Sequence, residues 1–295
     1  MREIREIGSY EGKQHCAITL GKFDGLHRGH QKLIRRVKEY ASAGVESVVC
    51  AFDMGKESLL TGQERRGRLS ALVDSLVVCP FTKEIREMEA EVFIRRVLAE
   101  TFHAAYIVVG TDFQFGRGKG GDAALLEASA KRYGYHLDVI EKERYRGQVI
   151  SSTYIKEALC EGNVELARAL LGYPYQISGK VEHGRQLGRT LGFPTMNVAP
   201  EKGKIMPRFG VYACQIEIEG RCFPGIGNVG IKPTVTEAHR PLVEVFAFDY
   251  DGDAYGKEVT VTFCTFERPE EQFHSVEELQ NRVKADIQFG KAYFS

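Results

Sequence analysis

The residues from Gly21 to His30 have the types and spacing that phosphate chemistry requires. The stretch reads GKFDGLHRGH, with His27 and His30 three residues apart. An apolar run over Cys16–Leu20 precedes it and a helical pattern follows it, which predicts a strand, a glycine-rich turn and a helix. Backbone N–H groups and a helix N-terminus receive phosphates in that arrangement, and imidazoles can bind phosphate oxygens. The stretch therefore predicts a nucleotide site. The alternative is an ordinary turn with two surface histidines.

A second loop, Thr111–Asp122, follows another apolar run and mixes aromatic side chains, glycines and cations. Phe113 and Phe115, together with Arg117 and Lys119, suit a planar ring that carries a phosphate. The alternative is a flexible surface loop, because a single phenylalanine more often packs in a core. The sequence indicates a ligand loop here.

A third stretch, Gly184–Asn197, is dense in glycine, cations and small oxygen donors. Glycines let the backbone approach a phosphate, and the oxygens of Thr195 and Asn197 can coordinate a hard cation. From the chemistry alone, a glycine-rich turn of a β-barrel fits these residues as well as a nucleotide site does.

Glu244 lies between Val243 and Val245 in an apolar strand. A carboxylate without a partner is costly in such surroundings, which favours a functional or paired role. Under simple alternation of inward and outward side chains it would instead face solvent.

The first half of the chain alternates short apolar runs with helical patterns. We expect strands at Cys16–Leu20, Ser47–Phe52, Ser75–Cys79, Ala105–Gly110 and His136–Ile140. We expect helices at His30–Ala41, Arg65–Leu72, Ala90–Phe102 and Ala123–Tyr133. Such alternation predicts an α/β domain whose parallel sheet is covered on both faces. Ligands bind at the carboxyl ends of such strands, so Gly21–His30 and Gly110–Asp122 should share one crevice.

The sequence pattern changes from alternating strands and helices to mostly strands after two short helices. One helix begins at Ser151–Thr153 and the other covers Asn163–Leu171. Strands of alternating pattern are expected at Val211–Ile218, Leu242–Tyr250 and Glu258–Cys264. A last helix over Ser275–Phe289 carries an apolar stripe of Val276, Leu279, Val283 and Ile287. These elements predict a small β-barrel with a terminal helix. The predicted domains are residues 1–173 and 174–295.

Composition narrows the class of protein. The 295 residues are 43% hydrophobic and 27% charged, as in a globular protein with a core. Forty basic and forty acidic residues cancel, which argues against nucleic acid as a partner. No apolar segment approaches the length of a membrane span, and the N-terminus lacks a signal core, so we expect a cytoplasmic protein. Seven scattered cysteines favour reduced, buried thiols over disulfides or zinc. No feature indicates an oligomeric state.

Four motifs resemble those of bacterial bifunctional riboflavin kinase/FAD synthetases. Gly21–His30, the DFQFG of Asp112–Gly116 and the SSTYIK of Ser151–Lys156 resemble the adenylyltransferase module. The GRQLGRTLGFPTMN of Gly184–Asn197 resembles the riboflavin kinase signature. The resemblance implies a Rossmann-like nucleotidyltransferase domain followed by a riboflavin-kinase β-barrel. It also implies phosphorylation of riboflavin by ATP to FMN, and adenylylation of FMN to FAD with release of pyrophosphate. Both reactions would use Mg²⁺.

The resemblance also implies roles for single residues of the first domain. Those expected to bind ATP are Gly21, Lys22, Phe23, Asp24, Gly25, His27, His30, Ser152, Thr153 and Lys156. Those expected on the flavin side are Asp112, Phe113, Phe115 and Arg117. Transfer of AMP needs positioning and charge stabilisation and no covalent protein nucleophile, so the two histidines, cations and Mg²⁺ would suffice.

In the barrel, the resemblance makes Glu244 the base that activates the riboflavin 5′-hydroxyl. Residues expected to bind ATP are Gly184, Gly188, Arg189, Gly192, Thr195 and Asn197, of which Thr195 and Asn197 would also hold the Mg²⁺. Residues expected to bind flavin are Asn228, Gly230, Pro233, Thr234 and Arg268. The segment Gly225–Pro233 would be a flavin and nucleotide loop, and Phe273 matches the family before the terminal helix.

The chain departs from the family pattern at four places. Lys22 replaces a usual Asn, Lys156 a usual Arg, and Phe246 a common His. Asp53–Lys56 stands where a His-Pro pair is usual. Lysine keeps the charge of arginine but loses its planar fork. Two alternatives follow: a riboflavin kinase with a weak or inactive adenylyltransferase domain, and a non-catalytic protein that senses flavin or nucleotide.

Overall fold

The computed structural model describes the chain except for residues 13–14, 42–43, 184–191 and 233–239 and the side chain of Lys232. Packing divides the chain into two compact units, Met1–Ser152 and Thr153–Ser295. The segment from Thr153 to Gly172 therefore groups with the second unit by its internal contacts. The boundary between functional domains at 173/174 stays a prediction.

The first unit is built on a six-stranded sheet in the order β1-β4-β3-β2-β5-β8. Its strands are β1 (Arg2–Arg5), β2 (Cys16–Gly21), β3 (Glu46–Asp53), β4 (Ser75–Pro80), β5 (Ala104–Gly110) and β8 (His136–Ile140). Every neighbouring pair is parallel. The predicted parallel α/β architecture is confirmed, and the short edge strand β1 was not foreseen.

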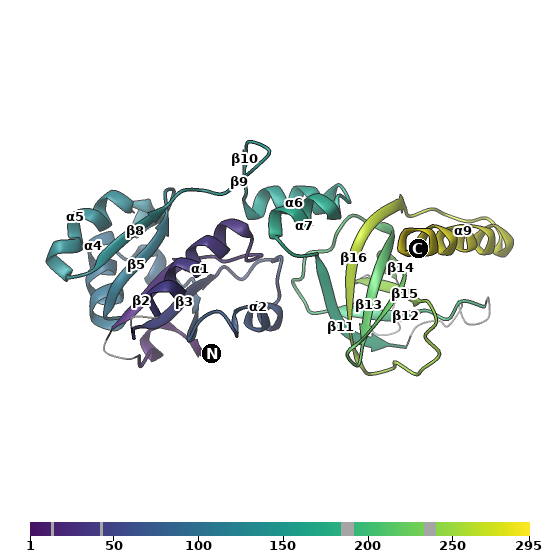
Figure 1. Cartoon of the computed structure of the whole chain (residues 1–295), viewed down its shortest axis with the longest axis horizontal. Coiled ribbons are helices and arrows are strands. Elements are labelled where there is room, and N and C mark those ends of the chain that lie inside the picture. Colours follow the sequence, from purple (N-terminus) through teal and green to yellow (C-terminus); the bar gives the residue numbers. More distant parts are fainter. Residues whose placement is uncertain (13–14, 42–43, 184–191, 233–239) are drawn as a thin grey trace. The chain divides into compact units, whose positions relative to one another are not determined.

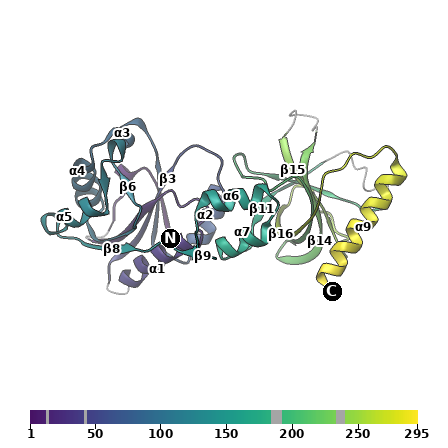
Figure 2. The ribbon, with the colours of Figure 1, turned by 90° about the horizontal axis from the view of Figure 1, so that it is seen from above.

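Both faces of this sheet are buried because the central strands carry apolar side chains at successive positions. Ile18 and Leu20 of β2 join the larger core, which packs against α4 (Ala90–Phe93) and the π-helical η2 (Ile94–Thr101). Ala17 packs on the other face with Val37 of α1 (Arg28–Ala41). Figures 1 and 2 show α1 and α4 on opposite sides of the strands. Strands buried on both faces read as continuous apolar runs, which is the pattern that predicted them.

The remaining elements of the first unit are short. They are η1 (Ile7–Ser9), α2 (Gly62–Leu69), α3 (Lys83–Glu87), α5 (Ala123–Tyr133), η3 (Arg117–Lys119) and the hairpins β6 (Gln114–Phe115)–β7 (Gly121–Asp122) and β9 (Arg144–Tyr145)–β10 (Gln148–Val149). Helix α5 has the predicted bounds, because Asp122 caps its first turn and Gly134 ends it at a φ of 74°. The hairpins escaped prediction because two-residue strands carry no periodic signal.

The second unit is a closed barrel in the order β11-β12-β15-β14-β13-β16. Its strands are β11 (Gln176–Glu182), β12 (Met196–Pro200), β13 (Gly210–Ile218), β14 (Arg221–Lys232), β15 (Arg240–Ala247) and β16 (Glu258–Pro269). Neighbouring strands are antiparallel. The predicted barrel is confirmed. One expectation needs correction, because most of the expected loop at Gly225–Pro233 is the strand β14.

Three helices pack on the barrel. Helices α6 (Ser152–Cys160) and α7 (Val164–Leu171) form a hairpin, of which α7 packs against β16. The terminal helix α9 (Val276–Phe294) lies along β14 and β13, and Figure 2 shows it on the outside of the barrel. Three residues of the expected apolar stripe, Leu279, Val283 and Ile287, are half-buried, whereas Val276 is 59% exposed. The fully buried residues of α9 are Asp286 and Gly290.

All seven cysteines are unpaired, as expected. Cys16, Cys50, Cys79 and Cys214 are buried, and burial raises the thiol pKa of Cys16 to about 12. Cys160 and Cys222 are exposed, which corrects the expectation that the thiols are all buried. Helices long and apolar enough to cross a membrane are absent from the described part of the chain.

Candidate active sites

The loop between β2 and α1 holds a conformation that the protein imposes on it. Phe23 and Leu26 have φ values of 47° and 41°, in the left-handed region that non-glycine residues rarely adopt. Both side chains are buried, at 0% and 3% exposed, so packing of these two anchors stabilises the strained turn. Gly25, between them, has a φ of 84°. Backbone strain at the end of a central strand is typical of a ligand site.

His27 and His30 are brought together at the start of α1. Their rings stack with centroids 3.7 Å apart, and the Phe23 ring lies 5.1 Å from that of His30. His27 precedes the first residue of α1, and its Nδ1 accepts a long hydrogen bond, 3.4 Å, from the His30 backbone N–H. An accepting Nδ1 leaves the ring proton of a neutral imidazole on Nε2.

Burial lowers the pKa of both imidazoles, which favours their neutral forms in the free protein. Burial lowers the pKa of His27 to about 4, against a smaller opposing effect of Asp24. Burial, and then the neighbouring His27, lower the pKa of His30 well below its usual value. His30 Nδ1 is buried and lacks a hydrogen-bond partner among the described residues. Two neutral rings in a polar loop can donate hydrogen bonds to an anion and can be protonated when its charge arrives.

Asp24 ties the loop to two other segments. Its Oδ1 accepts a hydrogen bond from the Leu59 backbone N–H at 2.6 Å, and its carbonyl oxygen accepts one from Ser152 Oγ at 2.8 Å. Ser152 is also the first residue of α6, and Thr153 and Lys156 follow on that helix in the second unit. Of the predicted ATP residues on the SSTYIK stretch, the structure brings Ser152 to the loop.

Two cations beside the histidines were missed by sequence reasoning. Arg28 and Lys32 both pair with Glu143, at 2.7 and 3.1 Å, and together they lower its pKa. Their i, i+4 spacing on the first turns of α1 was the available signal. Lys22, which replaces the family's usual Asn, is exposed. The loop therefore combines neutral donors with nearby positive charge.

The second predicted loop follows β5, the neighbour of β2, so the two loops lie at the same edge of the sheet. Asp112 pairs with Lys142 at 2.7 Å, and Arg117 pairs with Glu89. Phe115 is buried and its ring lies 5.4 Å from that of Phe93 in the core. Phe113 lies partly exposed, its ring 5.5 Å from that of Phe115. Phe113 thus offers an aromatic surface, whereas Phe115 supports it from the core.

In the barrel, three neighbouring strands place predicted residues in one row. Asn197 of β12 lies opposite Glu244 of β15, which lies opposite Asn228 of β14. Thr195 Oγ1 donates a hydrogen bond to Glu244 Oε1 at 2.6 Å. Val243 and Val245 on either side are fully buried, so Glu244 faces outward and is paired, which combines both sequence interpretations. The row gathers a carboxylate, a hydroxyl and two amides.

The row continues towards the terminal helix. Asn228 Nδ2 donates to Glu270 Oε1 at 3.2 Å, and a Cβ at Gly230 would lie 2.1 Å from the same oxygen, so a larger residue there would require the exposed Glu270 side chain to shift. Arg268 is buried and makes a two-pronged ion pair with Asp286 of α9. Glu270 and Asp286 were missed by sequence reasoning, because neither lies in a recognisable motif.

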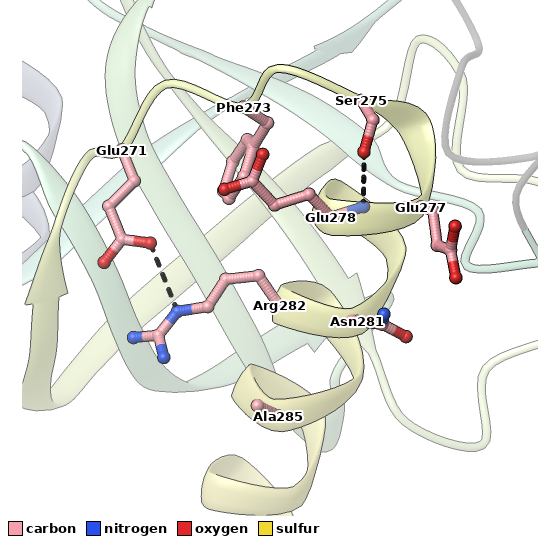
Figure 3. A pocket seen from close by; sticks show the side chains of 8 residues that line it. All are labelled: Glu271, Phe273, Ser275, Glu277, Glu278, Asn281, Arg282 and Ala285. Carbon is pink, nitrogen blue, oxygen red and sulfur yellow. Dashed lines mark hydrogen bonds and ion pairs between the residues drawn. The ribbon is translucent and has the colours of Figure 1, made fainter.

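A pocket of about 590 Å³ opens where β16 leads into α9. Figure 3 shows its lining: Glu271, Phe273, Ser275, Glu277, Glu278, Asn281, Arg282 and Ala285. Glu271 pairs with Arg282 at 3.4 Å, and Ser275 caps α9 by accepting a hydrogen bond from the Glu278 N–H at 3.0 Å. The pocket is open to solvent and offers one aromatic ring, Phe273, among charged and polar groups.

Five predicted residues lie outside the described part of the chain: Gly184, Gly188, Arg189, Pro233 and Thr234. Gly192, at the end of the third stretch, has a φ of 91°, which only glycine adopts readily. Clusters of three or more His, Cys, Asp or Glu side chains that could hold a metal are absent from the described residues.

Known proteins resemble both units. A family model of FAD synthetase matches residues 9–154, and one of riboflavin kinase matches residues 171–294. The bifunctional riboflavin kinase/FMN adenylyltransferase of Haemophilus influenzae is 36% identical over 96% of this chain and 95% of its own length. The protein of the same name from Escherichia coli K12 is 33% identical, over 100% and 98%. The chain belongs to the bifunctional riboflavin kinase/FMN adenylyltransferase family.

As a member of this family, the protein converts riboflavin to FMN and FMN to FAD, and uses ATP to do so. A solved structure from Streptococcus pneumoniae, described as a macrolide-efflux protein, is also similar. Its TM-score is 0.86 over 98% of each chain, at 28% sequence identity. The fold of this chain is therefore shared by that Streptococcus pneumoniae protein.

Proposed function

We propose that the barrel unit phosphorylates riboflavin, with Glu244 as the base that accepts the proton of the 5′-hydroxyl. A general base must lie within hydrogen-bond reach of the groups it serves, and Glu244 already accepts a hydrogen bond from Thr195. Its register with Asn197 and Asn228 supports a site built on three strands of one barrel wall. The hydrogen bond from Thr195 to Glu244 is the observation that carries this assignment.

The same residues fit a magnesium ion. Mg²⁺ prefers hard oxygen ligands and keeps several waters and phosphate oxygens in its shell, so it needs few protein donors. Thr195 supplies a hydroxyl oxygen, and Asn197 lies opposite Glu244 in the same row and supplies an amide oxygen. In our proposal Thr195 and Asn197 hold the ion, which would neutralise the charge of the ATP phosphates.

The pocket at the start of α9 is our candidate for the riboflavin ring. Phe273 provides an aromatic surface, and Glu271, Asn281 and Arg282 provide groups that can bind the polar edge of a ring. Asn228 and Gly230 were predicted on the flavin side, and Glu270, next to the pocket residue Glu271, contacts both positions.

For the first unit we propose transfer of AMP at the Gly21–His30 loop. His27 and His30 donate hydrogen bonds to the ATP phosphates, and Arg28 and Lys32 offset charge on the departing pyrophosphate. The FMN lies on the side of Asp112, Phe113 and Arg117, since these follow the neighbouring strand. Phe115 then supports that surface from within the core.

Glu244→Gln tests the kinase assignment. The variant keeps the size of the side chain and removes the base, so we expect formation of FMN from riboflavin to fall at least 100-fold. Formation of FAD from added FMN should stay within twofold of the wild-type rate. Products are separated by chromatography after incubation with ATP and Mg²⁺.

The matched control is Glu217→Gln, an exposed glutamate on strand β13 of the same barrel. It should leave both activities unchanged. A Glu244→Gln variant that makes FMN at the wild-type rate would rule out Glu244 as the base. Loss of both activities in a folded variant would contradict the assignment of the two reactions to different residues.

A further inference from the structure

Helix α9 is attached to the barrel by a buried ion pair. Asp286 is 2% exposed and Arg268 is 8% exposed. Arg268 Nε donates to Asp286 Oδ1 at 2.9 Å, and Arg268 Nη2 donates to Oδ2 at 2.7 Å. Two parallel hydrogen bonds of this kind fix orientation as well as distance, which an apolar contact does not. The pair therefore fixes the middle of α9 to the end of strand β16, while the helix lies along β14 and β13.

A bulge in β16 aims Arg268 at the helix. Val211 of β13 pairs with Arg268, but the next residue, Tyr212, pairs with Phe266, so Glu267 is extra on the β16 side. A bulge bends its strand and redirects the side chains next to it. Val211 also pairs with Asn228, which pairs with Glu244. Arg268 therefore occupies the end of the same cross-strand row as the base.

The ion pair also reaches the wall of the pocket. Arg268 Nη1 lies 3.7 Å from Glu271 Oε2, and Arg282 Nε lies 3.4 Å from the same oxygen. Arg282 Nε is also 3.5 Å from Asp286 Oδ1. Glu271 and Arg282 both line the pocket. Four alternating charges thus connect the buried pair to the pocket, whose side chains are shown in Figure 3.

We infer that Arg268 and Asp286 form a positioning pair for riboflavin phosphorylation, and that Arg268 is not itself a flavin ligand. The Arg268 guanidinium already donates hydrogen bonds to both carboxylate oxygens of Asp286, and the Arg268 side chain is buried. The pair joins the middle of α9 to the end of β16, and so restrains the segment from Glu270 to Ser275 between them. It thereby sets the distance between the pocket and Glu244. This inference rests on the proposed use of the pocket for the riboflavin ring.

Asp286→Asn separates a positioning role from a ligand role. The substitution leaves Arg268 in place and weakens its anchor. A flavin ligand released from its ion pair would bind riboflavin as well as before or better. A positioning residue that loses its anchor instead lets the pocket move. We expect the KM for riboflavin to rise at least 10-fold while kcat falls less than threefold, because Glu244, Thr195 and Asn197 remain on the barrel wall.

A double-mutant cycle sharpens the test. Arg268→Ala should raise the KM for riboflavin about as much as Asp286→Asn, and the double variant should add little, since both break one contact. Arg268→Lys keeps the positive charge but cannot make two parallel hydrogen bonds. Its KM for riboflavin should therefore lie between those of the wild type and Arg268→Ala. Additive effects of Arg268→Ala and Asp286→Asn, or a wild-type KM in Asp286→Asn, would overturn the inference.

Two internal checks accompany these measurements. Adenylylation of added FMN should stay within twofold in every variant, which shows that the first unit is intact, and circular dichroism should show that the barrel is folded. Lys284→Gln, an exposed charge removal on α9, should leave the KM for riboflavin unchanged. If Asp286→Asn proves too unstable to purify, Asp286→Glu provides the test, because it keeps the carboxylate and changes the geometry of the ion pair, with an expected rise in KM of at least threefold.

Phe273→Ala distinguishes failure of this inference from failure of the proposed pocket. An unchanged KM for riboflavin in Phe273→Ala would remove the pocket from the proposal and the positioning role with it. A raised KM in Phe273→Ala together with a wild-type KM in Asp286→Asn would keep the pocket and reject the positioning pair.

Discussion

At the scale of single residues, the histidines of the first loop are prepared for an anion by being neutral. A charged imidazole pair at 3.7 Å would repel itself, and burial already disfavours charge on either ring. The approach of phosphate oxygens reverses this preference, since an anion stabilises a protonated ring. The free protein thus avoids the cost of two buried charges, and under the proposed function the rings would acquire charge only when phosphate oxygens supply the partner.

Glu267, in the bulge of β16, has a raised pKa, so its surroundings favour the neutral, protonated carboxyl group. Burial first, and then the nearby Asp286, raise its pKa from 4.5 to about 7, while Arg268 and Arg282 oppose the shift. Its Oε2 is buried without a hydrogen-bond partner among the described residues. The folded protein therefore holds this proton more tightly than the unfolded chain does.

This shift predicts a pH dependence of stability. Between pH 4.5 and about 7 the unfolded chain has lost the proton of Glu267 and the folded protein keeps it, so stability falls as pH rises. Above pH 7 the cost is complete. Because the side chain is partly exposed, solvent screens part of the effect, and we expect Glu267→Gln to raise the free energy of unfolding by about 1 kcal/mol at pH 8. Near pH 4 the variant and the wild type should be equal.

The measurement is urea unfolding of the wild type and of Glu267→Gln at pH 4, 6 and 8, followed by circular dichroism. Glu217→Gln, exposed on β13, controls for the loss of a surface carboxylate. A stability difference between the wild type and Glu267→Gln that is the same at all three pH values would contradict a shifted pKa.

At the scale of elements, periodic patterns predicted most of the fold. The strands β2 to β5 and the helix α5 follow the expected ranges closely, because buried parallel strands and the α5 cap carry strong local signals. Strand β14 was not expected, since its glycines resemble a loop. They allow close contacts that only the barrel reveals: a Cβ at Gly225 would lie 2.2 Å from the Phe246 carbonyl oxygen.

Residues of the candidate sites could be predicted where they belong to a sequence motif. Contacts between residues far apart in the sequence could not. Thr195 and Glu244 were both predicted, but their hydrogen bond depends on the pairing of β12 with β15. Asp286 gave no signal, because a charged residue on a helix usually indicates a solvent face. The apolar stripe of α9 identified three half-buried residues but not the two fully buried ones at its contact with the barrel, Asp286 and Gly290.

Gly290 supplies a prediction about that contact. A Cβ at this position would lie 2.7 Å from Ile226 Cγ2 and 3.0 Å from Phe248 Cζ, so alanine overpacks the interface between α9 and the barrel. Overpacking costs about 1–3 kcal/mol, and the better helix propensity of alanine returns up to about 1 kcal/mol. We therefore expect Gly290→Ala to lower the free energy of unfolding by about 1 kcal/mol in urea. Gln288→Ala, on the exposed side of α9, should change it by less than about 0.5 kcal/mol.

At the scale of the whole molecule, each unit carries its own family match and its own set of chemical groups. The first unit offers neutral histidines and cations, and the barrel offers a carboxylate with oxygen donors. Transfer of AMP to a phosphate needs no base for an alcohol, whereas phosphorylation of riboflavin does. Each unit therefore carries the kind of chemical groups that its own reaction requires.

This division predicts complementation between two inactive variants. Glu244→Gln should not make FMN, and His27→Asn/His30→Asn should make FMN without converting it to FAD. Mixed in equal amounts with riboflavin, ATP and Mg²⁺, they should produce FAD after a lag, because FMN released by one variant reaches the other through solution. The lag should shorten as the concentration of both proteins rises, and chromatography of the flavins follows it. Each variant alone is the control. If FMN accumulates in the mixture and no FAD forms, although Glu244→Gln converts added FMN, the adenylyltransferase does not draw on released FMN.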